Sequence, residues 1–318
     1  MLTICYTTAR ENPRFEWFLD GLLNQVEGEP DFELLVIDFH NDARPLVYSI
    51  PERFMGWAET RLRFTTPKPS VWQGKHRRTR DDFFAQANTR NTGICMARGD
   101  YIVFVDDLSV PLPGWLKAAR ESAAVGRIVC GGYRKVRQLV VEKGSIVSYV
   151  DSPAGRDHRY QYGTLNGAVK CLGQWFYGCS CGAPLEAFLR INGYPEITDG
   201  MGYEDSVTGS MLERHGYLIV YDARMMTYEA EELHSEGKRM LRWDPGNSPA
   251  DKSHALLSIT SGAKETPGYF GPGGIRGLRD RIQAGGEFPV ERIPEHEWFT
   301  GKRLEDLDID RIKAGMPT

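Results

Sequence analysis

The sequence predicts an α/β fold, in which a mixed but mainly parallel, Rossmann-like sheet is flanked by helices. In the first half of the chain, short continuous apolar runs alternate with segments of helical periodicity, as in parallel sheets covered by crossover helices. Two of those runs end in acidic residues, at Asp38 and at Asp106-Asp107. Because ligands of such sheets bind beyond the carboxyl ends of the strands, these acids predict a binding site at that edge.

The first elements follow from these two patterns. Residues 2–6 are an apolar run and form the first predicted strand. Residues 13–25 are predicted to be a helix, because apolar side chains recur at helical spacing and Pro13 suits a first turn. Residues 33–38 form a buried strand. Residues 40–80 are rich in proline, arginine and aromatic residues and are predicted to be loops with one edge strand.

The alternation continues through the middle of the chain. A helix is predicted over residues 82–98, with Gly99 at its C-terminal stop. The next predicted elements are a strand over 101–105, a helix over 113–123, a strand over 127–133 and a hairpin within 133–150 that turns at Glu142-Lys143-Gly144.

Composition is that of a globular domain. Of the 318 residues, 41% are hydrophobic and 26% charged, which suffices for one large domain or two small ones. No apolar run is long enough to span a bilayer, and the N-terminus lacks the features of an export signal. Six scattered cysteines are expected to be reduced thiols in a cytoplasmic protein. The net charge of −4 excludes a global basic field.

The composition of the sequence changes after His234-Ser235. Residues 237–318 are rich in proline and glycine, and only two short helices are predicted there, near 277–284 and 304–313. We therefore expect residues 1–236 to form the main domain, with 237–318 as an irregular extension on the acceptor side or in assembly rather than an independent domain. Association into a homo-oligomer is left open.

Three acidic clusters carry candidate chemistry. The adjacent carboxylates of Asp106 and Asp107 are costly to bury, and a divalent cation or a ligand hydroxyl would relieve that cost; a surface turn is the alternative. Glu204 and Asp205 follow Gly200-Met201-Gly202 and open a helix, where they suit either a general base or simple capping. His234 stands beside Glu231 and Glu232 as a metal ligand or a polar surface residue.

Two ordered blocks of residues resemble a known family. The first runs from Ala87-Asn88-Thr89-Arg90-Asn91-Thr92-Gly93 through Tyr101–Asp107 to Pro111-Leu112-Pro113-Gly114-Trp115. The second contains Asn192-Gly193-Tyr194 and Gly200-Met201-Gly202-Tyr203-Glu204-Asp205, followed by His234-Ser235. Together they resemble family 2 glycosyltransferases of the GT-A fold. The second block is also similar to chondroitin-polymerase-like enzymes and beta-1,4-galactosyltransferases.

The resemblance, which spans roughly residues 1–236, implies a role for each matching residue. Thr7 and Arg10 would line the donor nucleotide, Asp38 would face its base, and Asp106 would contact the donor ribose or the metal. Arg90 is a further candidate for binding the donor. Asp107 and His234, with Asp106 nearby, would hold a divalent cation, Mn²⁺ or Mg²⁺. Asp205 would be the catalytic base, and Glu204 would contact acceptor or donor sugar.

One position departs from the family pattern. Two places after the first aspartate the family usually has a further ligand, and this chain has Leu108, whose side chain cannot bind a metal. Either Asp107 acts with His234, or the metal is weak or absent. In the second case Lys75, Arg77, Arg78 or Arg90 would neutralise the diphosphate instead.

The function that the resemblance implies is a hexosyltransferase-type, inverting glycosyltransferase that uses a nucleoside diphosphate sugar, UDP being favoured over GDP. The alternatives are a non-catalytic sugar or nucleotide binder and a sugar nucleotidyltransferase, although Thr7-Thr8-Ala9-Arg10 has no glycine-rich phosphate loop. The acceptor hydroxyl is left open between glycan, protein, lipid head group, small molecule and modified DNA base. The basic run of residues 75–80 is a solvated loop or a clamp for phosphates.

Overall fold

The computed structural model describes residues 1–70, 73–77, 84–163, 167–196, 203–236, 263–266, 268 and 270–290. Several sequence predictions concern residues outside these ranges. They are Arg78 to Arg80 of the basic run, residues 82 and 83 of the helix predicted over 82–98, Gly200 and Gly202, and the helix predicted over 304–313; residues 84 and 85 are described and precede the helix, which begins at Gln86.

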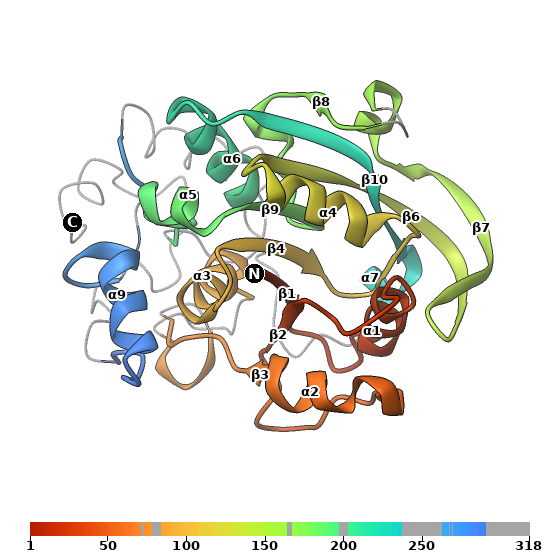
Figure 1. Cartoon of the computed structure of the whole chain (residues 1–318), viewed down its shortest axis with the longest axis horizontal. Helices are drawn as coiled ribbons and strands as arrows, with labels where there is room; N and C mark the ends of the chain where they lie inside the picture. The colour runs from red at the N-terminus through yellow and green to blue at the C-terminus, as the bar shows by residue number, and fades with distance from the viewer. Residues whose placement is uncertain are drawn as a thin grey trace.

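Within the described ranges the strands form one ten-stranded sheet in the order β3-β2-β1-β4-β9-β6-β10-β5, with β7 paired to β6 and β8 to β10 (Figure 1). The pairs β1–β2, β1–β4, β2–β3 and β6–β10 are parallel, and β9 lies antiparallel between β4 and β6. The strands are β1 (Leu2–Thr8), β2 (Phe32–Asp38), β3 (Leu62–Thr65), β4 (Tyr101–Asp106), β5 (Ser109–Pro111), β6 (Ile128–Glu142), β7 (Ser145–Arg156), β8 (Val169–Lys170), β9 (Ser180–Pro184) and β10 (Ile219–Ala230). The predicted α/β class and mainly parallel sheet are confirmed.

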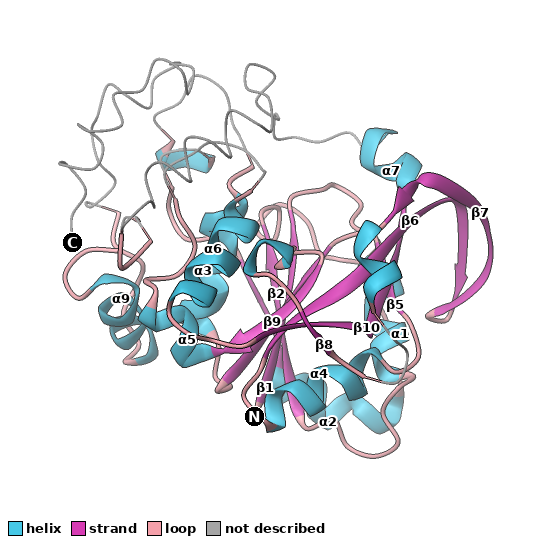
Figure 2. Cartoon of the chain, turned by 90° about the horizontal axis from the view of Figure 1, so that it is seen from above, coloured by secondary structure: helices cyan, strands magenta, loops and turns pink. Residues whose placement is uncertain are grey.

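Helices cover both faces of this sheet (Figure 2). One face carries α1, α2 and α4, and the other carries α3, α5, α6 and α9. The helices are α1 (Phe15–Leu23), α2 (Met55–Arg61), α3 (Gln86–Met96), α4 (Trp115–Ala124), α5 (Leu185–Arg190), α6 (Glu204–Arg214), α7 (Glu231–Glu236) and α9 (Gly274–Gln283). Short 3₁₀ turns are η1 (Glu52–Phe54), η2 (Gly74–His76), η3 (His158–Tyr162) and η4 (Gly173–Trp175).

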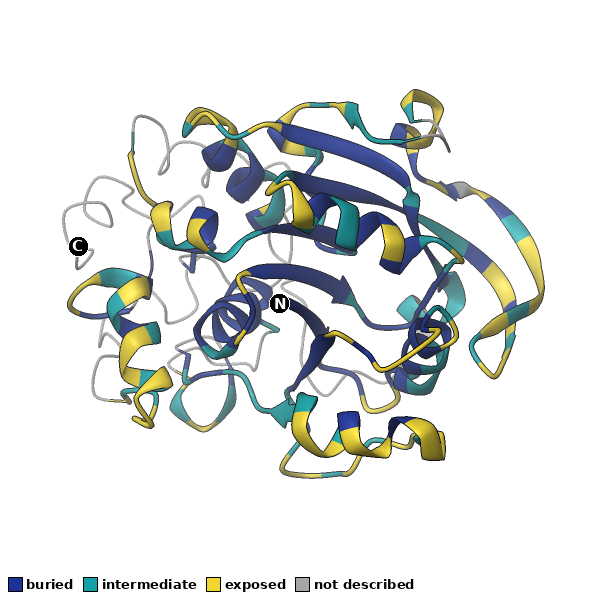
Figure 3. Ribbon diagram, in the orientation of Figure 1, coloured by how far each residue is buried: buried dark blue, intermediate teal, exposed yellow. Residues whose placement is uncertain are grey.

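The central strands are buried on both sides, as Figure 3 shows. In β1, Ile4 and Tyr6 pack into the core under α1 and α4, whereas Cys5 packs into the core under α3. Successive side chains of a strand point to opposite faces, so both faces must be apolar. This is the physical reason for the continuous apolar runs in the sequence.

The strand register places the predicted acids at one edge. Thr8 of β1 lies opposite Asp38 of β2, and Thr7 lies opposite Asp106 of β4. Both aspartates therefore stand at the carboxyl ends of parallel strands on either side of β1, as expected from the sequence.

Several predicted boundaries are wrong. Residues 40–80 contain η1 and α2 as well as the edge strand β3, because Trp57 of α2 is buried and its indole N–H donates to the Phe32 carbonyl at 2.7 Å. Strand β6 continues beyond residue 133 to Glu142, where the hairpin turns at Lys143-Gly144 as predicted.

The described part of the C-terminal extension packs against the main domain. Ile275 and Leu278 of α9 are buried in the same apolar core as Ile94 of α3. Arg279 of α9 also donates to the carbonyls of Ile94, Cys95 and Ala97 at the C-terminal end of α3. No helix among the described residues is long and apolar enough to cross a membrane.

Candidate active site

Arg90 occupies the centre of the carboxyl edge and joins two of the predicted acids. Its side chain, on α3, is 2% exposed and contacts Glu204 Oε1 at 2.9 Å and Asp106 Oδ1 at 3.3 Å. Burial opposes the charge on Arg90, yet Asp106 and Glu204 hold the pKa of its guanidinium well above the ordinary value. The arginine therefore stays charged and fixes the strand end of β4 against the start of α6.

Local packing explains why Arg90 sits there. Asn91 accepts from the Tyr194 amide at 2.8 Å and donates to the Tyr194 carbonyl, which ties α3 to the segment before α6. A Cβ on Gly178 would meet Arg90 Nη2 at 1.5 Å, so only glycine fits over the guanidinium. A Cβ on Gly93 would lie 3.0 Å from Cys5 and Phe104, so the lack of a side chain at Gly93 lets α3 approach the sheet closely.

Asp106 is the acid of the β4 end that reaches solvent. Its side chain is 33% exposed, and Oδ1 accepts from Gln86 Nε2 at 3.0 Å in addition to the contact with Arg90. The surrounding protein removes water from the carboxyl group and raises its pKa, an effect that Arg90 opposes. An open carboxylate at this point is placed to accept from a ligand hydroxyl.

Glu204 and Asp205 begin α6 and point to different partners. Glu204 is buried against Arg90, whereas Asp205 is partly exposed. Asp205 Oδ2 accepts from the Gly178 amide at 2.9 Å and Oδ1 from the Ser206 amide at 2.7 Å. Adjacent helical residues diverge by about 100°, and here that divergence separates a structural ion pair from a positioned, accessible carboxylate.

Asp107 is held by Arg10 and Thr8. Arg10 Nε lies 2.9 Å from Asp107 Oδ1, and the Thr8 hydroxyl donates to Asp107 Oδ2 at 2.7 Å. The same guanidinium donates through Nη1 to the Leu233 carbonyl at 3.1 Å and lies 3.2 Å from His234 Nδ1 through Nη2. Arg10 thus joins the end of β4 to α7, from which Arg10 itself is more than 220 residues away in the sequence.

The arrangement of these side chains does not fit the metal site predicted for Asp107 and His234. Arginine only donates, so His234 Nδ1 accepts from Arg10; in the neutral ring Nε2 then carries the hydrogen, 3.2 Å from Glu229 Oε2. The lone pair of Nδ1 therefore faces Arg10 and not a cation. Leu108 is 1% exposed in the core, and no group of three or more His, Cys, Asp or Glu side chains among the described residues is arranged to hold a metal.

Asp38 organises the loop that follows β2. It is fully buried, accepts from the His40 amide at 2.9 Å and pairs with Arg44 at 3.1 Å. Loss of water raises its pKa, and the His40 amide and Arg44 oppose that rise. A cavity of about 460 Å³ adjoins this loop, lined by residues 41–46 with Tyr48 and Phe64, whose rings are stacked at 5.5 Å.

The described part of the basic run, residues 75–77, lies near the same edge. Lys75 and Arg77 are exposed, and a Cβ on the neighbouring Gly74 would lie 3.7 Å from the Phe39 ring, just beyond the end of β2. Gln73 is buried and accepts from the Ala85 amide at 2.9 Å, which fixes the run beside the start of α3.

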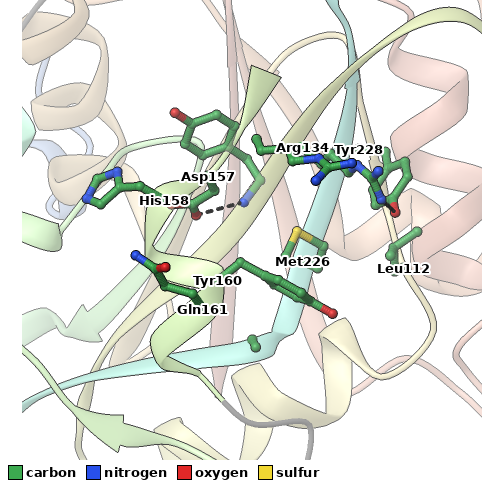
Figure 4. A pocket seen from close by; sticks show the side chains of 11 residues that line it. Leu112, Arg134, Asp157, His158, Tyr160, Gln161, Met226 and Tyr228 are labelled. Atoms are coloured by element: carbon green, nitrogen blue, oxygen red, sulfur yellow. Dashed lines mark hydrogen bonds between the residues drawn. The ribbon is translucent and has the colours of Figure 1, made fainter. Parts of the chain in front are cut away.

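Two further cavities lie in the second half of the described chain. One of about 280 Å³ is lined by residues in and next to η3, η4 and α6, among them His158, Tyr177, Tyr203 and Ser206. The second, of about 670 Å³, shares His158. Figure 4 shows His158 at one end of this larger cavity and Arg134 beside Tyr228 at the other, where Arg134 donates to the Tyr228 hydroxyl at 2.9 Å.

Sequence reasoning found the acids but not most of their partners. Gln86, Arg44 and Glu229 were not singled out from the sequence, and the contacts that Thr8 makes with Asp107 and Gly178 with Asp205 join segments 99 and 27 residues apart. One signal was present in α3, whose buried residues include Gln86, Asn88, Thr89, Arg90, Asn91 and Thr92. Buried polar groups need partners, so a polar helix between two apolar strands indicates a side-chain network.

Comparisons with known proteins give little beyond the arrangement of the backbone. No protein-family model and no curated protein matches the sequence. Crystal structures of S. aureus TarS and of its residues 1–349 match with TM-scores of 0.48 and 0.47, each at 12% identity. The matches cover 89% and 82% of this chain but only 42% and 65% of those chains. A likeness of this size says nothing of activity or substrate.

Proposed function

We propose that this chain is an inverting glycosyltransferase, which moves a sugar from a nucleoside diphosphate sugar to an acceptor hydroxyl. The observation that carries the proposal is the Arg90 bridge. It joins Asp106, at a strand end suited to donor binding, to the start of α6, where Asp205 presents an accessible carboxylate. A donor-side acid and a base are thus held in one rigid unit, which group transfer between two substrates requires.

The donor would lie along the carboxyl ends of β2, β1 and β4. The loop that Asp38 organises and the stacked rings of Tyr48 and Phe64 suit a nucleobase, with UDP the favoured nucleotide. Asp106 would accept from a ribose hydroxyl. Lys75 and Arg77, exposed beside this edge, would neutralise the diphosphate as it leaves.

Asp205 would accept the proton of the acceptor hydroxyl. Two backbone amides, of Gly178 and Ser206, hold its carboxylate, and Tyr177 and Ser206, the chain neighbours of Gly178 and Asp205, line a cavity together with Tyr203. The hydroxyl oxygen would attack the anomeric carbon as the bond to the diphosphate breaks, so that the product has inverted configuration. Aromatic walls suit an acceptor with a ring that stacks, which a sugar or a nucleobase provides.

The test is a screen of UDP- and GDP-sugars against hydroxyl acceptors, with release of nucleoside diphosphate as the signal. We expect release to depend on both a nucleotide sugar and an acceptor, and NMR of the product to show an inverted anomeric centre. If calorimetry detects no binding of any nucleoside diphosphate, with or without Mn²⁺ or Mg²⁺, the proposal fails.

A further inference from the structure

Arg10 carries more contacts than a residue that simply lines a donor pocket would need. Each of its three guanidinium nitrogens has its own partner, on Asp107, Leu233 and His234 respectively. The residue is 7% exposed, and its amide donates to the Thr8 hydroxyl that in turn donates to Asp107. The guanidinium is therefore built into the edge of the sheet rather than placed on its surface.

The contacts of Arg10 are those that a divalent cation would make at this point. A cation shared by Asp107 and His234 would neutralise the carboxylate and bind the lone pair of an imidazole nitrogen. The guanidinium neutralises Asp107 at 2.9 Å and occupies the lone pair of His234 Nδ1 at 3.2 Å. It also anchors α7 through the Leu233 carbonyl at 3.1 Å.

Each of the two strand-end acids has an arginine partner, although Asp106 shares its arginine with Glu204. Asp107 is paired with Arg10 and Asp106 with Arg90, and both arginine side chains are at least nine-tenths buried. Leu108, the position at which a further ligand is expected, has a left-handed backbone (φ 60°) and is buried. Its amide donates to the Pro13 carbonyl at 3.0 Å, which fixes the side chain inside the core.

We propose that Arg10 takes the place of a divalent cation between Asp107 and His234, so that nucleotide binding at this edge needs no metal ion. The role in nucleotide binding rests on the proposed function, whereas the exclusion of a cation by Arg10 does not. Arg10 is a positioning residue, since it acts through Asp107 and His234.

Removal of the guanidinium should create a metal site where none existed. We expect Arg10→Ala to expose Asp107 Oδ1 and His234 Nδ1 together and to bind Mn²⁺ about tenfold or more tightly than the unchanged protein. The double variant Arg10→Ala/His234→Ala should lose that gain. Arg120→Ala, which removes an arginine from a more exposed pair with Asp31, is the matched control and should not gain Mn²⁺ binding.

The measurement is a titration of each protein with Mn²⁺ alone, followed by the electron paramagnetic resonance signal of free Mn²⁺. The proposal is overturned if a folded Arg10→Ala protein gains no binding. It is also overturned if the unchanged protein binds one Mn²⁺ that His234→Ala abolishes, a result that decides the question even where Arg10→Ala does not fold.

A second titration links the cation to the nucleotide. UDP binding by the unchanged protein should be the same in EDTA and in Mn²⁺, and a requirement for Mn²⁺ would contradict the proposal. If UDP does not bind under either condition, the proposed function fails for this nucleotide, while the Mn²⁺ titrations still decide what Arg10 does.

Discussion

At the scale of single residues, Arg90 is a buried cation that pairs with two acids of the candidate site. Replacement by methionine would leave Glu204 buried without the guanidinium. Loss of one member of a buried ion pair typically costs about 3–5 kcal/mol, and we expect that loss in the free energy of unfolding measured with urea. Arg120→Met, in a surface pair with Asp31, should cost about 1 kcal/mol or less. Equal losses in the two variants would show that the buried ion pairs of Arg90 contribute no more to stability than a surface pair does.

Asp38 gives a prediction about pH. Its folded-state pKa is raised above the ordinary 3.8, so the folded protein binds more protons than the unfolded chain between that value and the raised one. The contribution of Asp38 to stability therefore falls as pH rises through this window. Urea unfolding from pH 4 upward should show the stability of the unchanged protein declining relative to that of Asp38→Asn. A relative rise over the same range would contradict the assigned direction.

At the scale of elements, α9 tests whether the C-terminal extension supports the site. Arg279 donates to three carbonyls at the end of α3, the helix that carries Arg90. Hydrogen bonds from a charged donor are each worth about 1.5–3 kcal/mol, and we expect Arg279→Ala to lower the free energy of unfolding by about 2 kcal/mol. Arg276→Ala, on the same helix in an exposed pair with Glu186, is the control and should have little effect. If both variants are equally stable, the hydrogen bonds of Arg279 do not stabilise the packing of α9 on α3.

Elements with a strong local pattern could be predicted from the sequence, and elements held by distant contacts could not. Strands such as β1 and β4 are apolar on both faces, so their composition alone identifies them. Helix α2 escaped prediction because Trp57 is its one buried residue, so its seven residues show no apolar face at helical spacing. The surroundings of Arg90 depend on Glu204 of α6 and on Gly178, both more than 80 residues away in the sequence.

At the scale of the whole molecule, topology accounts for the site more than any single motif does. Parallel pairing of β2, β1 and β4 places Asp38 and Asp106 at one edge. The apolar runs that end in these acids, alternating with helices, predicted this arrangement. The sequence did not predict that Arg10 would join that edge to α7, because the two segments meet only after the chain has folded. The boundary between residues 236 and 237 stays a prediction, although α9 lies in the same core as α3.

The most direct test of the central claim is the rate of sugar transfer by Asp205→Asn with donor and acceptor saturating. Asparagine can still accept from the Gly178 amide, so folding and nucleotide binding should persist. If Asp205 is the base, the rate should fall by roughly 10²–10⁴, while Asp31→Asn, a substitution at an exposed acid, leaves it unchanged. Near-normal transfer by a folded Asp205→Asn protein would contradict the account.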